Sequence, residues 1–318
     1  MNTRELGSDG AAISVIGYGA WEAGGGYHGQ NPPDEELVAA MRAGFDAGIN
    51  WVDTAEAYGA GHSEELVGEA IDGYGDVLVA TKVVMRPFGS GLDARGIRAG
   101  ADASRRRLRR ETLDLYQLHL PDPSVPLEES WETMARLVDE EVVRQIGVSN
   151  FPLELVERCE RIRHVDTVQL HFSLLYREDY HGLQPFCEEN GIAILAYGPL
   201  GFGVLTGTMT PDTRFAEDDW RSGGVPIPTP MYEQVFAPGV FEEHLATVDA
   251  LRPAAREKGI TLAQLALAWV VAQPGITAAI AGSRSASRVR ENAAAGSIEL
   301  TPTDLDEIDS ALAAERPA

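Results

Sequence analysis

The chain of 318 residues has few cysteines and no long apolar run. Its two cysteines, Cys159 and Cys187, do not show the spacing of a metal site, which argues against a disulfide framework and favours a reducing compartment. No apolar run reaches the length of about 18 residues that a membrane-spanning helix needs, and the N-terminal segment has no apolar signal region. We therefore expect a cytoplasmic protein with no membrane partner.

Basic residues are also scarce. The chain has 26 Lys and Arg against 49 Asp and Glu, which gives a formal charge of −23. Such an excess of acid repels nucleic acids and anionic membranes, so neither is expected as a partner. The basic run 105–110 is accordingly interpreted as the solvated outer face of a helix. An anionic ligand would have to be bound by locally placed arginines or backbone amides.

Lysine is the rarest charged residue, because only Lys82 and Lys258 occur beside 24 arginines. Lys82 ends an apolar segment, 77–82, that we predict to be a strand. A compact ammonium can change its pKa and share a proton network, whereas a guanidinium cannot, so chemistry is one reason for this exception. The alternative is chance, with the ammonium extending to water.

Short apolar segments alternate with amphipathic ones along most of the chain. Near-continuous apolar strands of this kind form parallel sheets that helices cover. Eight such units close a barrel better than they extend an open sheet, so we predict an α/β fold, a (β/α)8 TIM barrel, in a single domain over residues 1–318. The predicted strands are 13–18, 50–53, 77–82, 113–118, 143–148, 166–171, 192–197 and 277–281, and the predicted helices are 34–48, 63–70, 95–110, 128–140, 152–160, 181–190, 241–258, 261–273, 286–294 and 303–313.

Three features go beyond the eight repeated units. Residues 3–16 predict an N-terminal β-hairpin that turns at Asp9-Gly10, and the C-terminal part contains two extra helices. Asp34 is the predicted cap of the first helix, and Thr261 with Gln264 forms a predicted capping box. The Gly/Pro-rich segment 198–239 is too long for a plain connection and is interpreted as a lid or binding loop.

Polar residues stand at the C-terminal ends of six predicted strands, where the sites of such barrels lie. Together they offer a carboxylate, an ammonium, an imidazole, a phenol and amide groups, which suits proton transfer. They are Asp53, Lys82, His119, Ser149, Asn150, Gln169 and Tyr197.

The chain resembles the aldo-keto reductase superfamily in several motifs, which occur in order over almost the whole length. The family implies transfer of a hydride between C4 of a nicotinamide cofactor and a small-molecule carbonyl compound. The motifs are Val52-Asp53-Thr54-Ala55-Glu56-Ala57-Tyr58-Gly59, Ala80-Thr81-Lys82, Asp114-Leu115-Tyr116-Gln117-Leu118-His119, Gly147-Val148-Ser149-Asn150 and Gly282-Ser283-Arg284 through Glu291-Asn292.

The resemblance implies a catalytic role for four residues. Tyr58 would be the general acid that protonates the carbonyl oxygen, and Lys82 would favour the phenolate and so lower the pKa of Tyr58. Asp53 would hold the ammonium of Lys82, and His119 would orient the carbonyl. Each residue alone also has a structural explanation, as a surface aromatic, a turn residue or a core histidine; their joint placement at one barrel rim favours catalysis.

The resemblance also implies a cofactor site for NADPH. The carboxamide of the nicotinamide would meet Ser149, Asn150 and Gln169, while the Tyr197 ring would stack on the nicotinamide. A glycine-rich loop after Tyr197 would pass the pyrophosphate, although Gly198 stands where relatives often have a polar residue. The full implied set is Gly19, Ala20, Trp21, Asp53, Ser149, Asn150, Gln169, Tyr197, Gly198, Pro199, Leu200, Gly201, Gly203, Gly282, Ser283, Arg284, Arg288, Glu291 and Asn292.

The 282–292 segment carries the preference for NADPH over NADH. By family match Ser283, Arg284 and Arg288 would hold the 2′-phosphate and Asn292 would reach the adenine, at the start of a helix that suits an anion. Some relatives have Lys where Gly282 stands, so this chain would rely on arginine. The alternative is that these arginines only solvate the helix surface.

Two other functions remain open from the sequence. One is a nicotinamide-sensing regulatory subunit with little turnover, since the superfamily includes channel-associated members. The other is a metal-dependent lyase or isomerase that would use Asp53, Glu56 and His119. The physiological substrate, the reaction direction and the oligomeric state are not predicted, but aromatic residues suggest an apolar or flat substrate; they are Trp21, Tyr27, Trp51 and Trp220, with the loop 214–238.

Overall fold

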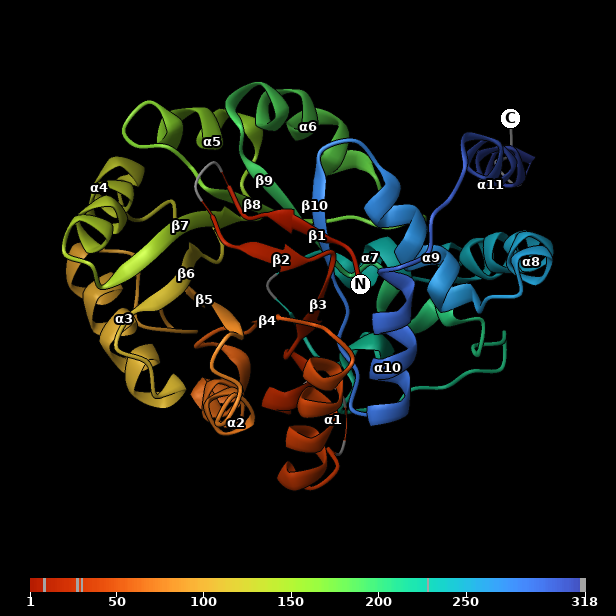
Figure 1. Ribbon diagram of the computed structural model, residues 1–318, viewed down its shortest axis with the longest axis horizontal. Helices are drawn as coiled ribbons and strands as arrows, with labels where there is room; N and C mark the ends of the chain where they lie inside the picture. The colour runs from red at the N-terminus through yellow and green to blue at the C-terminus, as the bar shows by residue number, and fades with distance from the viewer. Residues whose placement is uncertain (8–9, 27–28, 30, 228, 315–318) are drawn as a thin grey trace.

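Parallel strands close into a barrel that an outer layer of helices surrounds (Figure 1). The structure, a computed structural model, describes residues 1–7, 10–26, 29, 31–227 and 229–314. The barrel strands are β3 (Ile16–Gly19), β4 (Trp51–Asp53), β5 (Leu78–Val83), β6 (Leu113–Leu118), β7 (Val143–Ser149), β8 (Thr167–His171), β9 (Ala193–Tyr197) and β10 (Ile276–Ile280). Their order around the barrel is β10-β3-β4-β5-β6-β7-β8-β9.

The helices of the outer layer follow the strands along the chain, as the alternating pattern predicted. They are α1 (Asp34–Asp46), α2 (His62–Ala70), α3 (Ala94–Leu108), α4 (Leu127–Asp139), α5 (Leu153–Glu160), α6 (Glu178–Asn190), α8 (Val240–Lys258), α9 (Leu262–Ala272), α10 (Ala286–Ala295) and α11 (Pro302–Ala314). The short helix α7 (Met231–Val235) lies in the segment 198–239. The (β/α)8 barrel is therefore confirmed.

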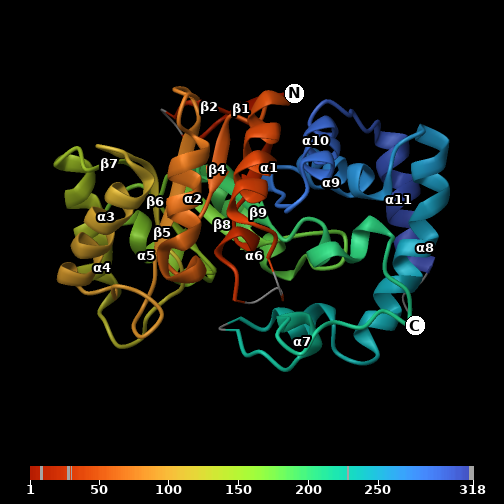
Figure 2. The same ribbon diagram turned by 90° about the horizontal axis from the view of Figure 1, so that it is seen from below.

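A small hairpin closes one end of the barrel. Strand β1 (Thr3–Glu5) pairs antiparallel with β2 (Ala12–Ser14), so residues predicted to begin the first barrel strand belong to the hairpin instead. Asp9 lies outside the described residues. Figure 2 shows the hairpin at one end of the molecule and helix α7 at the opposite end.

The barrel interior at the hairpin end is filled by apolar side chains. Leu6 and Ile13 of the hairpin segment pack there against Trp51, Leu115 and Leu195. The Trp51 indole donates to the Ser14 carbonyl at 2.8 Å. Trp51 is thus a core residue, and its predicted place in a substrate pocket is wrong, because its side chain points toward the hairpin end.

Several local predictions are corrected by the structure. Pro33, not Asp34, is the N-cap residue of α1, and Asp34 is the first helical residue. Helix α6 begins at Glu178, three residues before its predicted start. The segment 198–239 contains α7 and two short 3₁₀ turns, 201–206 and 220–222. The capping box of Thr261 and Gln264 is confirmed.

Helix α3 carries the first three arginines of the basic run, and one of them is largely withdrawn from solvent. Arg107 Nε donates to Glu64 Oε2 at 2.7 Å, and the Glu64 side chain, on α2, is fully buried. Thr81 Oγ1 of β5 donates to the other carboxylate oxygen of Glu64 at 2.6 Å. The prediction of a solvated face therefore fails for Arg107, which joins α3 to α2.

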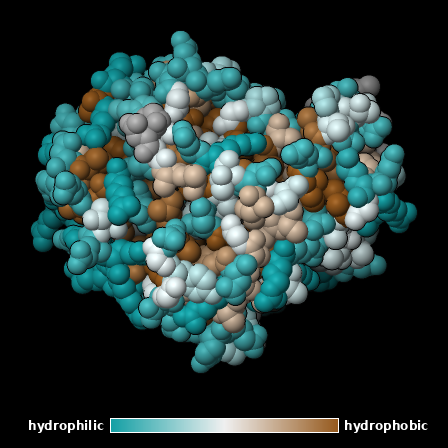
Figure 3. Space-filling model, viewed as in Figure 1, coloured by the Kyte–Doolittle hydropathy of each residue, from teal (hydrophilic) through white to brown (hydrophobic). Residues whose placement is uncertain are grey.

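The surface seen from the hairpin side is mostly hydrophilic, with apolar residues visible between the outer helices (Figure 3). In the described part of the chain, no helix has the length and apolar character needed to cross a membrane. Cys159 and Cys187 are both free and buried, and burial raises the pKa of each thiol to about 12. Neither thiol is therefore a ready nucleophile.

Candidate active site

Four polar side chains, which we call the tetrad, meet at the barrel end opposite the hairpin: Asp53, Tyr58, Lys82 and His119. Asp53 ends β4, Lys82 lies near the end of β5, and His119 follows β6 directly. Tyr58 comes from the loop after β4. Lys82 Nζ donates to Asp53 Oδ1 at 2.6 Å and to the Tyr58 hydroxyl at 3.3 Å, and the rings of Tyr58 and His119 meet edge to face at 5.5 Å.

Asp53 is held from two sides. Its Oδ1 accepts from Lys82, and its Oδ2 accepts from Gln169 Nε2 at 2.8 Å. Lys82 Nζ also donates to the Thr54 carbonyl at 2.9 Å, so all three donor positions of the ammonium have an acceptor. A buried charge with complete hydrogen bonding is rigid, which fixes the ammonium beside Tyr58.

The surroundings keep Lys82 charged and Tyr58 protonated at neutral pH. Burial lowers the pKa of the Lys82 ammonium, but Asp53 and Tyr58 together outweigh burial, and the net pKa is raised. Burial is the largest influence on the pKa of Tyr58 and raises it, while Lys82 lowers it. The contribution of Lys82 has the predicted sign, but burial outweighs it, so the net pKa of Tyr58 is raised.

His119 is a neutral imidazole at physiological pH. Burial, and then the positive charge of Lys82, hold the pKa of His119 well below its usual range. Within the described part of the chain, its buried Nδ1 has no hydrogen-bond partner. A neutral ring beside a charged ammonium can orient an oxygen atom without competing for its proton.

Glu56 does not join these residues. Its Oε1 accepts from the backbone amides of Val84 and Ser90 at 3.0 and 2.9 Å, and its Oε2 accepts from Ser90 Oγ at 2.7 Å. The carboxylate therefore braces the loop after β5. Among the described residues, no three His, Cys, Asp or Glu side chains are arranged to hold a metal ion.

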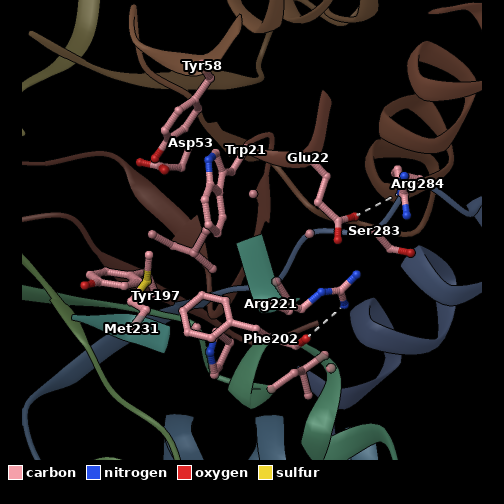
Figure 4. A pocket seen from close by; sticks show the side chains of 18 of the residues that line it. Trp21, Glu22, Asp53, Tyr58, Tyr197, Phe202, Arg221, Met231, Ser283 and Arg284 are labelled. Carbon is pink, nitrogen blue, oxygen red and sulfur yellow. Dashed lines mark hydrogen bonds and ion pairs between the residues drawn. The ribbon is translucent and has the colours of Figure 1, made fainter. Parts of the chain in front are cut away.

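A cavity of about 660 Å³ extends from the tetrad to the N-terminal end of α10. Figure 4 shows Tyr58 and Asp53 at one side of this pocket and Ser283 and Arg284 at another. Most of the residues predicted for the site line it: Gly19, Trp21, Asp53, Tyr58, His119, Ser149, Asn150, Gln169, Tyr197, Gly198, Pro199, Leu200, Gly203, Gly282, Ser283, Arg284, Arg288, Glu291 and Asn292.

Three predicted residues do not line the cavity. Lys82 is fully buried and reaches Tyr58 from behind. Ala20 is buried, and its backbone amide donates to the Asp53 carbonyl at 2.8 Å. Gly201 packs against Leu175, where a Cβ would lie 2.8 Å from a side-chain carbon. Ala20 and Gly201 therefore shape the wall without facing a ligand.

Amide and hydroxyl groups at the ends of β7 and β9 form a connected network. Asn150 Nδ2 donates to the His119 carbonyl at 3.1 Å and to Ser149 Oγ at 3.0 Å. The Tyr197 hydroxyl donates to Asn150 Oδ1 at 2.7 Å. Asn150 has a φ of 60°, a left-handed conformation that asparagine tolerates better than most residues. These contacts hold the Tyr197 ring at the cavity wall.

The far end of the cavity is basic. Arg284 and Arg288 lie at the start of α10, whose free backbone amides favour an anion. Glu22, on the facing loop, also lines the cavity, and its Oε2 lies 3.9 Å from Arg284 Nε. Arg284 Nη1 donates to Asn31 Oδ1 at 3.3 Å. Two arginines, of which Arg284 is partly neutralised by Glu22, therefore lie at the end of the cavity away from the tetrad.

Residues 15–313 match the model of the protein family described as Aldo/keto reductase family. The chain belongs to the aldo/keto reductase family. Among curated relatives of this aldo/keto reductase, the aldo-keto reductase YhdN of Bacillus subtilis (strain 168) is 36% identical over 292 residues, covering 89% of this chain and 85% of that protein. A probable voltage-gated potassium channel subunit beta of Arabidopsis thaliana is 29% identical and covers 98% and 97% of the two chains.

Solved structures of the family are also similar to this aldo/keto reductase. The glycerol dehydrogenase AKR11B4 from Gluconobacter oxydans superposes with a TM-score of 0.87 at 32% identity, over 99% of this chain and 96% of that one. An aldo/keto reductase from Klebsiella pneumoniae, in complex with NADP and acetate, superposes with a TM-score of 0.75 at 32% identity, over 98% and 95%.

The wall near the tetrad of this aldo/keto reductase is aromatic and apolar. Trp21 lines the cavity and packs on Trp220, which is fully buried, with ring centroids 5.7 Å apart. Trp220 therefore supports the wall from behind. Tyr27 lies outside the described residues. The segment 214–238 contributes Arg221, Ile227, Thr229 and Met231 to the lining, and its part in substrate binding stays a prediction.

Sequence reasoning missed two charged residues of this cavity. Glu22 lies in the glycine-rich loop, where its carboxylate had no motif to mark it. Arg221 follows Trp220, and its Nε and Nη2 donate to the Asp219 carboxylate at 2.9 and 2.6 Å. In the sequence, the run Asp219-Trp220-Arg221 within an irregular loop was the only signal that could have indicated Arg221.

Proposed function

We propose that this aldo/keto reductase is an NADPH-dependent oxidoreductase that reduces an aldehyde or ketone to an alcohol. One observation carries the proposal: the Lys82 ammonium, fixed by Asp53, lies 3.3 Å from the Tyr58 hydroxyl at the wall of the cavity. A phenol with a charged ammonium beside it can give up a proton in a transition state and be stabilised afterwards.

Tyr58 is the proposed general acid. A carbonyl oxygen placed against the phenol receives the Tyr58 proton as the carbonyl carbon becomes an alcohol carbon. The phenolate that remains is stabilised by Lys82, whose Nζ already donates to this oxygen. Asp53 keeps the ammonium in place, and burial strengthens the attraction because little water screens it.

His119 is the proposed orienting residue. Its ring is neutral, lies edge-on to Tyr58 and lines the cavity. Such a ring can donate a hydrogen bond to the same carbonyl oxygen and set its direction. A protonated imidazole would repel Lys82, which is why burial must keep this ring neutral.

The residues present fit a nicotinamide cofactor, which would supply the hydride. Ser149, Asn150 and Gln169 offer amide and hydroxyl groups near the tetrad, and Arg284 and Arg288 offer positive charge at the other end of the cavity. The similar structure from Klebsiella pneumoniae contains NADP. We propose that the guanidinium groups of Arg284 and Arg288 bind phosphate of NADPH at this end of the cavity.

The proposal is tested by titrating the protein with NADPH and NADH, followed by intrinsic fluorescence, and then by measuring NADPH oxidation with a panel of aromatic and aliphatic aldehydes and ketones. We expect saturable NADPH binding and turnover of at least one carbonyl. The absence of nicotinamide binding would contradict the proposal.

A second function has one observation in its favour, the similarity to the potassium channel subunit beta. The alternative is a nicotinamide-sensing regulatory subunit with little turnover. Tight and persistent NADPH binding, with no oxidation on any carbonyl of the panel, would favour this alternative over the reductase.

We predict that Arg284→Ala weakens NADPH binding about tenfold and leaves NADH binding nearly unchanged, because a charged hydrogen bond to the 2′-phosphate is lost. The measurement is the dissociation constant of each cofactor by fluorescence titration. Arg290→Ala is the matched control, since Arg290 is an exposed arginine on α10, the helix that Arg284 precedes, and does not line the cavity. Equal losses for NADPH and NADH would show that Arg284 does not read the 2′-phosphate.

A further inference from the structure

A buried histidine stands directly behind the Tyr197 ring. His171 ends β8, Tyr197 ends β9, and the two are register partners in the parallel sheet. Their rings stack with centroids 5.4 Å apart and planes 13° apart. Tyr176 also stacks on His171, with centroids 4.6 Å apart and planes 12° apart. Tyr197, which lines the cavity, therefore belongs to a group of three stacked rings.

The imidazole also contacts the segment 198–239. His171 Nδ1 lies 3.1 Å from Gln234 Oε1, and Gln234 belongs to α7. An amide oxygen only accepts, so Nδ1 carries the proton. The same helix carries Met231, which lines the cavity. The His171 side chain thus connects the Tyr197 ring with a helix that supplies another part of the cavity lining.

Gly198 makes room for this histidine. It has a φ of +64°, and a Cβ at this position would lie 2.9 Å from His171 Cδ2 and 3.1 Å from His171 Nε2. His171 is 2% exposed, and burial lowers its pKa to about 4, so the ring is neutral at physiological pH. A neutral ring can stack flat on Tyr197 without a desolvated charge.

We propose that His171 is a positioning residue with two separable actions: its ring supports Tyr197 from behind, and its Nδ1–H holds α7 through Gln234. The inference rests on the proposed function in one respect, that Tyr197 stacks on the nicotinamide. Ring support affects cofactor affinity, because a loosely held tyrosine must be ordered when the cofactor binds. The hydrogen bond affects the substrate side, because it fixes the helix that carries Met231.

Two substitutions separate these actions. His171→Asn keeps a donor near the Nδ1 position but removes the ring, whereas His171→Phe keeps a ring and removes the donor. We expect His171→Asn to weaken NADPH binding about fivefold, the scale of a lost aromatic pair. We expect His171→Phe to leave NADPH binding within about twofold and to raise the KM for the carbonyl about fivefold, the scale of a lost hydrogen bond.

Gln234→Met tests the same hydrogen bond from the other side and should raise the KM at least as much as His171→Phe, because it also removes the hydrogen bond between Gln234 and Tyr176. His181→Asn and His181→Phe are matched controls, since His181 is an exposed histidine on α6. All titrations are made well below the melting temperature of each variant, as measured by circular dichroism. If His171→Phe does not fold, Gln234→Met replaces it in the comparison, and if His171→Asn does not fold, it is replaced by His171→Gln, which also removes the ring.

The experiment measures the NADPH dissociation constant without substrate and the carbonyl KM separately. A loss of NADPH affinity that is confined to His171→Asn would show that the ring of His171 supports Tyr197. A rise in KM that His171→Phe and Gln234→Met share would show that the hydrogen bond acts on the substrate side. Equal effects of both His171 variants on both quantities, or no effect of either, would overturn the proposal. If the wild type binds NADPH but reduces no carbonyl, the reductase function fails, while the NADPH titrations still decide whether His171 supports the ring.

Discussion

Tyr58→Phe is expected to lower the kcat for carbonyl reduction by about 10²- to 10⁴-fold, the usual contribution of a positioned general acid. The substitution removes only the hydroxyl that lies 3.3 Å from Lys82 Nζ and leaves the ring against His119. NADPH affinity should stay within about twofold, because the hydroxyl is proposed to act on the carbonyl oxygen and not on the cofactor. Steady-state kinetics with the best carbonyl of the panel, and NADPH titration, make the measurement.

The pH dependence gives a second readout of the same residue. Because burial raises the pKa of Tyr58, its proton is retained through neutral pH, and the reduction rate should fall only in the alkaline range where the phenol ionises. Tyr74→Phe is the matched control, since its hydroxyl donates to Asp46 at the surface, away from the cavity. Turnover of Tyr58→Phe within tenfold of the wild type would rule out Tyr58 as the general acid.

Glu64→Ala is expected to lower the free energy of unfolding by about 3–5 kcal/mol, the cost of breaking a buried ion pair by removing one partner. The Glu64 side chain is fully buried, and its two oxygens accept from Arg107 and Thr81. The substitution leaves the Arg107 guanidinium, on a side chain that is 22% exposed, without this acceptor and opens a space between α2 and α3. Urea unfolding followed by circular dichroism measures the change.

Glu65→Ala on the same helix is the control for Glu64→Ala. Glu65 is exposed, so its removal should change stability by no more than about 0.5 kcal/mol. Glu64→Ala combined with Arg107→Ala should cost less than the two single changes added together, because the second removes the charge that the first leaves uncompensated. A Glu64→Ala variant as stable as Glu65→Ala would contradict the structural role of this pair.

The fold could be predicted because its signals are local. Apolar segments of strand length, alternating with amphipathic helical ones, specify which residues pair and which cover the sheet, and parallel strands bring their carboxyl ends to one rim. Asp53, Lys82 and His119 could be placed together for that reason alone. Helix ends could be predicted less well: α6 begins at Glu178, three residues before its predicted start, and Pro33 stands at the cap position predicted for Asp34.

Contacts between side chains far apart in the sequence were decided only by tertiary structure. The burial of Glu64 made Arg107 its partner, although the arginine run suggested a solvated face. The net pKa of Tyr58 depends on how completely the folded chain excludes water from it, which no motif states. His171 stands behind Tyr197 because the register of β8 and β9 pairs them, and register is set by closure of the whole barrel. The chemistry of each side chain and the spacing of apolar residues can be read from a segment of sequence. The burial of a side chain and the register of paired strands are fixed only in the folded molecule.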